Sequence, residues 1–133
     1  MVDKITPFLM FEGHAEAALN LYLNLIPGAE LKRMDRYGPG EPGKEGQISR
    51  ALVVLAGQEF MAFDSPVHHT FSFTPSISLF VDCADEAEIE TLFSALSEGG
   101  EVRMPLNNYG FSLRFGWVDD RFGVSWQLNL PAA

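Results

Sequence analysis

The sequence repeats one pattern of residue types after 71 residues, and this internal repeat limits the possible folds more than any other feature. When the chain is shifted by the separation of Leu21 and Leu92, the apolar stripes of two helix-like segments coincide. Gly28 and Gly99, which end the two segments, coincide at the same shift, as do the strand-like residues that follow them. Any two amphipathic helices overlay at some shift, so it is this agreement outside the helices that indicates a duplication.

Each copy of the repeat has the order β-α-β-β-β. The first copy contains predicted strands at residues 5–11, 31–37, 48–55 and 59–64 and a helix at 15–26. The second contains predicted strands at 76–81, 101–104, 112–118 and 124–130 and one helix. Asp85 is the predicted N-cap of that helix, Glu88 occupies the capping-box position, and Gly99 ends the helix. Residues 38–46, which are rich in glycine and proline, are predicted to form a mobile loop.

The two copies predict one α+β domain at residues 1–133, with module one at 1–64, a linker at 65–75 and module two at 76–133. A single β-α-β-β-β module cannot bury both its helix stripe and its sheet face, so the two modules are expected to pair. Eight strands in two paired modules then form a half-barrel, and its concave side is the expected place for a small-molecule pocket.

Charge and composition narrow the classes of partner. The chain has 9 Lys and Arg against 18 Asp and Glu, and a net charge of -9 argues against nucleic acid and anionic lipid as partners. The single cysteine, Cys83, excludes an intramolecular disulfide and is predicted to be a structural or surface thiol rather than a nucleophile. No apolar run approaches the ~20 residues of a membrane span and no signal-peptide pattern is present, so a cytoplasmic protein is expected.

Three segments resemble a known family. They are residues 5–11 (ITPFLMF), residues 15–18 (AEAA) with Tyr22, and residues 120–127 (DRFGVSWQ). Together they resemble the PhnB-like branch of the vicinal oxygen chelate superfamily, which includes glyoxalase I, bleomycin-resistance proteins and extradiol dioxygenases. The resemblance implies the paired-module fold and a homodimer. Many members are labelled 3-demethylubiquinone-9 3-methyltransferase, but no glycine-rich loop leads from a strand into a helix as a methyl-donor nucleotide requires, so no cofactor is predicted.

The resemblance also allows a test for a metal site. Metal-dependent relatives hold one divalent ion with four ligands, one from the first and one from the last strand of each module. The equivalent positions here are Pro7, Met61, Ser78 and Gln127. Divalent ions of this kind prefer His, Glu or carbonyl oxygens, and only Gln127 could coordinate one. The sequence therefore predicts no metal site.

The three histidines are the remaining candidates for metal or acid–base chemistry. His14 lies where the first helix begins and is interpreted as a helix-entry residue rather than a catalytic base. His68 and His69 are adjacent in the linker, where an extended backbone points neighbouring side chains to opposite sides. Both are predicted to be solvated loop residues.

The last strand supplies the candidate binding residues. Its alternation places Ser125, Gln127 and Asn129 on one face and Trp126 on the other, and the resemblance implies that the Gln127 face lines the cavity. Arg114 either recognises a ligand carboxylate or forms a salt bridge with Asp119 or Asp64. The complete predicted ligand-binding set is Gln127, Asn129, Ser125, Met61, Phe63, Glu59, Phe11, Phe80 and Arg114. An aromatic and amide lining of this kind suits a flat, partly apolar ligand.

Three functions remain open at this point. The favoured hypothesis is a metal-free module that sequesters or senses a small aromatic or hydrophobic compound, as bleomycin-resistance proteins do. The second is a metal-independent isomerase, lyase or transferase with Glu59 as the general base and Asp64 or Arg114 as further functional groups. The third is an interaction protein in which subunit pairing matters most. The missing metal ligands favour the first, and no catalytic residue is assigned.

Overall fold

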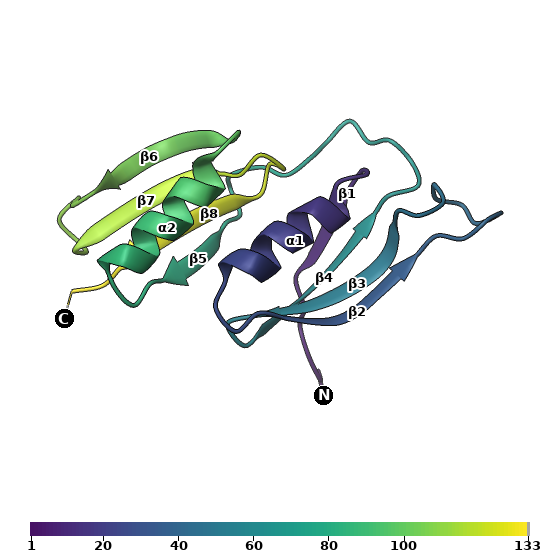
Figure 1. Cartoon of the computed structure of the whole chain (residues 1–133), viewed down its shortest axis with the longest axis horizontal. Coiled ribbons are helices and arrows are strands. Elements are labelled where there is room, and N and C mark those ends of the chain that lie inside the picture. The colour runs from purple at the N-terminus through teal and green to yellow at the C-terminus, as the bar shows by residue number, and fades with distance from the viewer. Residues whose placement is uncertain (133) are drawn as a thin grey trace. The chain divides into compact units, whose positions relative to one another are not determined.

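The computed structural model of the protein describes residues 1–132 and divides into two compact units, Met1–Thr70 and the chain from Phe71 onward (Figure 1). The boundary lies inside the predicted linker. Each unit contains one helix and one four-stranded sheet in the order β-α-β-β-β, which confirms the duplicated α+β fold. Among the described residues, no helix is both long enough and apolar enough to cross a membrane.

The first unit contains β1 (Phe8–Phe11), α1 (Ala15–Leu25), β2 (Glu30–Arg36), β3 (Ile48–Leu55) and β4 (Gln58–Asp64). The sheet order is β1-β4-β3-β2, with β1 parallel to β4 and the other pairs antiparallel. α1 covers one sheet face and buries four side chains, those of Ala15, Ala18, Leu19 and Tyr22. Leu19 is fully buried and Leu21 only half-buried, so the buried stripe extends toward Leu19 rather than toward Leu21.

The second unit contains β5 (Leu79–Asp82), α2 (Glu86–Ser97), β6 (Glu101–Asn107), β7 (Arg114–Asp119) and β8 (Ser125–Leu130), with the sheet order β5-β8-β7-β6. β5 is parallel to β8. Ile89, Leu92 and Leu96 of α2 are buried, and the sheet contributes Trp126 and Leu128 to the same core. β6 is three residues longer than predicted, because an edge strand tolerates Pro105 and the register shift around it.

The helix start in the second unit confirms the predicted cap. The Asp85 carboxylate accepts a hydrogen bond from the backbone N–H of Glu88 at 2.8 Å, and the Glu88 carboxylate accepts one from the N–H of Ala84 at 2.9 Å. These bonds satisfy backbone donors that have no partner within the helix. α2 therefore starts at the residue that its local sequence specifies.

Residues 37–47 connect β2 and β3, and hydrogen bonds fasten this loop, which the sequence predicts to be mobile. The backbone N–H of Tyr37 donates to the carbonyl of Gln47 at 2.9 Å, and the N–H of Gly46 donates to the carbonyl of Tyr37 at 3.0 Å. The Tyr37 hydroxyl donates to the backbone carbonyl of Asp64 at 2.8 Å. The loop thus extends the β2–β3 hairpin and is tied to the end of β4, a contact that the local sequence does not reveal.

Candidate functional site

Each sheet has one face covered by its helix and one face without a helix, which we call the open face. In the second unit the register identifies both faces, because residues paired across neighbouring strands point to the same side. A Cβ on Gly116 would lie 2.7 Å from the Phe93 ring of α2, so Gly116 and its pairing partner Leu128 face the helix. The residues that alternate with them form the open face: Phe80, Asp82, Phe115, Trp117, Asp119, Ser125, Gln127 and Asn129.

The amide side chains on this open face are held in fixed orientations. The Gln127 Nε2 donates to the Ser78 hydroxyl at 2.9 Å, and the Asn129 Nδ2 donates to the Asp82 carboxylate at 2.9 Å. The Ser112 hydroxyl donates to the Asn129 Oδ1, so that amide is held from both ends. A polar surface whose groups are already oriented loses little conformational entropy when a ligand binds.

An indole and an ion pair lie on the same face. The Trp117 Nε1 donates to the Ser125 hydroxyl at 2.8 Å, and Arg103 donates to the Asp119 Oδ2 at 2.7 Å from Nη2 and 2.9 Å from Nε. Ser125 is only 2% exposed. Its role here is to orient the Trp117 ring, and the guanidinium of Arg103 neutralises Asp119.

Four aromatic rings gather beside these polar groups. The Phe115 ring centroid lies 5.1 Å from that of Phe111, 6.2 Å from that of Tyr109 and 6.4 Å from that of Phe80. Phe80 is 57% exposed and Phe111 is 61% exposed, whereas Phe115 is buried beneath them. We call Phe80, Tyr109, Phe111 and Phe115 the aromatic cluster. It offers ring faces and edges to an incoming planar molecule.

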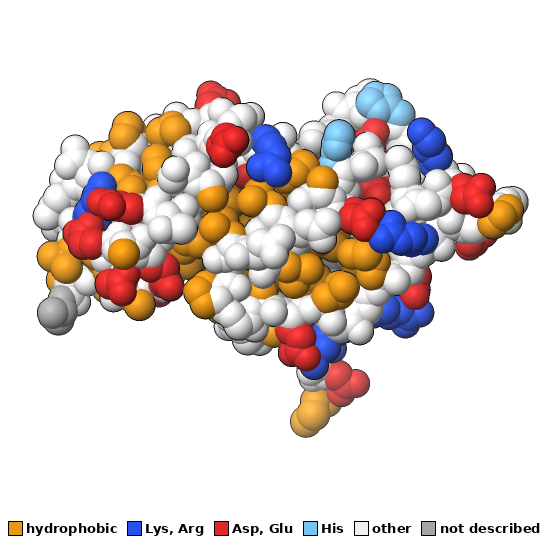
Figure 2. All heavy atoms as spheres, viewed as in Figure 1, with side chains coloured by type: hydrophobic (Ala, Val, Ile, Leu, Met, Phe, Trp, Pro, Cys, Tyr) orange, Lys and Arg blue, Asp and Glu red, His pale blue; other side chains and the backbone are white. Residues whose placement is uncertain are grey.

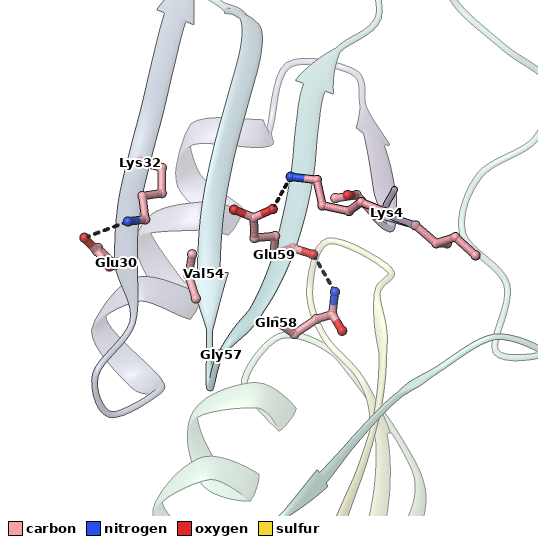
Figure 3. A pocket seen from close by; sticks show the side chains of 9 residues that line it. Lys4, Glu30, Lys32, Val54, Gly57, Gln58 and Glu59 are labelled. Carbon is pink, nitrogen blue, oxygen red and sulfur yellow. Dashed lines mark hydrogen bonds and ion pairs between the residues drawn. The ribbon is translucent and has the colours of Figure 1, made fainter. Parts of the chain in front are cut away.

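The first unit has an open face of its own. β-strand pairing places Phe8, Met10, Leu52, Val54, Glu59, Met61 and Phe63 on it. The Phe8 and Phe63 ring centroids lie 5.0 Å apart. At the β3–β4 hairpin end of this face, a pocket of about 420 Å³ is bordered by two ion pairs, Lys4–Glu59 at 2.6 Å and Lys32–Glu30 at 3.3 Å (Figure 3). Glu59, the predicted general base, is therefore engaged by an ammonium group.

The structure divides the predicted ligand-binding residues into two groups. Seven of them lie on an open face: Glu59, Met61 and Phe63 in the first unit and Phe80, Ser125, Gln127 and Asn129 in the second. Their contact with a ligand stays a prediction. Sequence reasoning missed Phe111, since no local pattern indicates that its ring lies against Phe115.

The other two residues of the predicted set, Phe11 and Arg114, do not lie on an open face. Phe11 is 3% exposed and pairs with the buried Asp64 on the helix side, because the face that β1 presents is shifted by one residue from the prediction. Arg114 also lies on the helix side, where its Nη1 donates to Glu90 at 2.6 Å and to Glu86 at 3.0 Å. Trp117 lies on the opposite face of the sheet from Arg114.

The four positions equivalent to metal ligands lie in adjacent pairs within each unit. The backbone N–H of Met61 donates to the Pro7 carbonyl at 2.9 Å, and the Gln127 amide donates to the Ser78 hydroxyl. A thioether, a proline ring, a hydroxyl and an amide whose nitrogen faces that hydroxyl do not provide the anionic or imidazole donors that a divalent ion requires. Within residues 1–132, no group of three His, Cys, Asp or Glu side chains is placed to hold an ion. These residues do not fit a divalent metal.

Two of the three histidines lie in the linker, and the third lies at the start of α1. The His68 Nδ1 lies 2.7 Å from the Glu12 carboxylate, and the hydrogen bond holds the pKa of Glu12 below its usual value. The other Glu12 oxygen accepts from the backbone N–H of His69 at 3.2 Å, and the His69 ring contacts the Ser65 hydroxyl at 3.0 Å. His14 immediately precedes α1, as predicted. The imidazole rings of the two linker histidines thus have different partners, Glu12 for His68 and Ser65 for His69.

Cys83 is 4% exposed, and burial, aided by the charge of Glu88, raises the pKa of its thiol to about 11. At pH 8 only about one thiol in a thousand is ionised, and only the thiolate reacts. We expect Ellman's reagent at pH 8 to modify the native protein at least about 100-fold more slowly than the protein in 6 M guanidinium chloride. Complete modification of the native protein at the unfolded rate would contradict a buried, inert thiol.

Two β-α-β-β-β units, each with a helix-free sheet face, define the paired-module fold of the vicinal oxygen chelate superfamily. The fosfomycin resistance protein FosX from Listeria monocytogenes has this fold, with a TM-score of 0.63 at 12% identity over 99% of this chain and 96% of that one. A family model described as 3-demethylubiquinone-9 3-methyltransferase matches residues 3–129. The chain belongs to that family, the PhnB-like branch that the sequence resembles.

Three relatives match almost the whole chain. The PhnB protein from Bacillus cereus is 52% identical with a TM-score of 0.94, covering 96% of this chain and 99% of that chain. Protein PA1353 from Pseudomonas aeruginosa is 33% identical with a TM-score of 0.84, covering 98% of both chains. Protein YjdN from Escherichia coli K12 is 27% identical over 95% of this chain and 94% of its own length. The similarity therefore covers both units.

Proposed function

We propose that the protein binds a small organic molecule without a metal ion, and that the open face of the second unit contacts this ligand. The proposal rests above all on one observation: exposed rings of the aromatic cluster lie beside amide groups whose orientations are set by Ser78, Ser112 and Asp82. Apolar surface with a few oriented polar groups is typical of small-molecule sites. The family and fold belong to the glyoxalase and bleomycin-resistance type of small-molecule-binding protein.

The groups considered for catalysis have other roles. Glu59 is ion-paired with Lys4, and Asp64 accepts three backbone hydrogen bonds in the core. Cys83 is buried with a raised pKa, and Arg114 is held by two glutamates of α2. Methyl transfer, which the family description names, lacks support from the loops before α1 and α2, because neither is a glycine-rich nucleotide loop. Binding is therefore the function that these residues favour.

Metal independence is tested by elemental analysis and by thermal unfolding with Mn²⁺, Zn²⁺ or Ni²⁺. A metal present at 100 times its Kd would stabilise the protein by about 2.7 kcal/mol. A gain of that size raises the Tm of a domain of this length by several degrees. We expect less than about 0.1 ion per chain and no such rise. One ion per chain together with a higher Tm would overturn the metal-free proposal.

Ligand binding is tested by NMR, because the chain has two tryptophans and they lie on opposite faces of one sheet. Trp117 is on the open face, and Trp126 is 2% exposed on the helix side. Aromatic fragments of different charge are added, and the indole N–H signals are assigned with a Trp117→Phe variant. We expect binding fragments to shift the Trp117 signal and leave that of Trp126 almost unchanged. A library in which no fragment shifts Trp117 would contradict the proposed site.

A further inference from the structure

We infer that the ligand is a planar organic cation, an aromatic ring system with a positively charged nitrogen, and that Asp82 recognises its charge. This inference rests on the proposed function, because it concerns the same open face. It specifies the chemical class of the ligand and assigns a specificity-determining role to the Asp82 carboxylate. Three observations support it: the charge of the second unit, the position of Asp82 and the exposed rings beside it.

The second unit is strongly acidic. Residues 71–133 contain nine Asp and Glu, three Arg and no Lys or His, which is a net charge of -6 out of the -9 of the whole chain. On the side drawn in Figure 2, acidic side chains predominate around α2. Such a field attracts cations and repels anions before any specific contact forms. The net charge of the unit therefore disfavours a carboxylate or phosphate ligand.

All three arginines of this unit already have partners. Arg103 is bound to Asp119, Arg114 is bound to Glu86 and Glu90, and Arg121 lies over the Phe122 ring with its guanidinium carbon 4.7 Å from the centroid. Asp82 forms no ion pair with any described residue. On the open face, Asp119 is neutralised and Asp82 keeps its charge available to a ligand.

The Asp82 carboxylate is exposed but its position is fixed. Its Oδ1 accepts from the Asn129 Nδ2 at 2.9 Å, and the Ser112 hydroxyl holds the other end of the Asn129 amide. Asn129 pairs with Asp82 on one side and with Phe115 on the other, so a single row across the sheet runs from the carboxylate to the aromatic cluster. A charge held in place beside a ring surface recognises a ligand that carries both features.

The aromatic cluster adds a second attraction for a cation. Ring faces carry negative electrostatic potential, and a cation within about 6 Å of a ring centroid is attracted to it. Phe80 and Phe111 are more than half exposed, and Phe80 precedes Asp82 by two residues on the same face of β5. The rings and the carboxylate therefore favour the same class of molecule, a flat ring system that bears positive charge.

The test uses probes that share a two-ring system and differ in charge: N-methylquinolinium, neutral quinoline at pH 8 and naphthalene-2-sulfonate. Affinity is measured from the Trp117 indole signal at a fixed, moderate salt concentration. We expect N-methylquinolinium to bind about tenfold more tightly than quinoline, and the sulfonate to bind most weakly.

Asp82→Asn keeps the carbonyl oxygen that accepts from Asn129 and removes only the charge. We expect it to reduce the preference for N-methylquinolinium over quinoline to about twofold or less. Glu98→Gln is the matched control, since it removes one exposed acidic charge after α2 and should leave the preference unchanged. Phe111→Ala should weaken both quinoline and its cation together.

The results of these titrations distinguish a failure of the cation assignment from a failure of the proposed binding site. Equal binding of quinoline and N-methylquinolinium, or a preference that survives Asp82→Asn, overturns the cation assignment and leaves the binding site intact. Loss of the preference in Glu98→Gln as well as in Asp82→Asn would show a general field effect and would also overturn the role of Asp82. If no probe and no fragment shifts Trp117, both proposals fail.

Discussion

Replacing Asp64 with asparagine is expected to lower the free energy of unfolding by about 3–5 kcal/mol. The Asp64 carboxylate is 1% exposed and accepts hydrogen bonds from the backbone N–H of Gly13 at 2.8 Å, Ala15 at 3.0 Å and Ile48 at 2.9 Å. These bonds join the end of β4 to the start of α1 and the start of β3. One side chain thus satisfies three backbone donors, and those of Ala15 and Ile48 are buried away from water.

Asparagine has nearly the same shape but only one acceptor oxygen. Each carboxylate oxygen of Asp64 accepts from at least one backbone N–H. In either orientation of the asparagine, its NH₂ group replaces one of these oxygens, so a buried donor is left without an acceptor. Urea unfolding followed by circular dichroism measures the change. Asp35→Asn is the control, because Asp35 forms a half-exposed ion pair with Arg33 and should cost less than about 1 kcal/mol. Similar losses in the two variants would contradict the role assigned to Asp64.

The Gly100→Ala variant is expected to lose about 3 kcal/mol of stability through a steric clash. A Cβ at position 100 would lie 2.1 Å from the backbone carbonyl oxygen of Asp119 and 3.0 Å from the carbonyl carbon of Asp120. Backbone atoms cannot rotate away as the end of a flexible side chain does, so the start of β6 and the end of β7 must separate. The next residue, Glu101, pairs with Asp119 across β6 and β7, and this pairing would be disturbed.

Gly28→Ala distinguishes this clash from ordinary backbone strain. Gly28 has a φ of 72°, and a Cβ added there would meet no neighbouring atom within 4 Å, so alanine incurs only the cost of a left-handed conformation, about 1 kcal/mol. Thermal and urea unfolding of both variants give the comparison. We also expect Gly100→Ala to shift the Trp117 indole signal, because Asp119 and Trp117 share the open face. Equal stability of the two variants would contradict the steric argument.

Much of the fold follows from local signals in the sequence. The repeat and the apolar periodicities identify all ten elements in order, with most boundaries within a few residues of the observed ones. Asp85 and Glu88 specify the start of α2, and the alternation of the last strand correctly places Trp126 in the core and Gln127 opposite it. Such signals are readable because helix and strand periods act over a few neighbouring residues.

The sequence predictions fail where the direction of a side chain depends on a one-residue shift in strand register or on a partner that is distant in the sequence. A strand shifted by one position turns every side chain to the other face, and this is why Phe11 is buried while Phe8 and Met10 are on the open face. Arg114 binds Glu86 and Glu90, which lie 28 and 24 residues away on another element. Nothing in the sequence around Arg114 indicates those partners.

The sequence by itself determined the duplicated α+β fold, the family resemblance, the residue types at the four positions equivalent to metal ligands and the acidic character of the second unit. Those properties depend on local periodicity, residue type and charge, which are present in the linear chain. Only the tertiary structure decided that Asp82 lies beside the aromatic cluster and that Glu59 is paired with Lys4. Both depend on which strands become neighbours and in which register, and pairing across a sheet joins residues that are far apart in the chain.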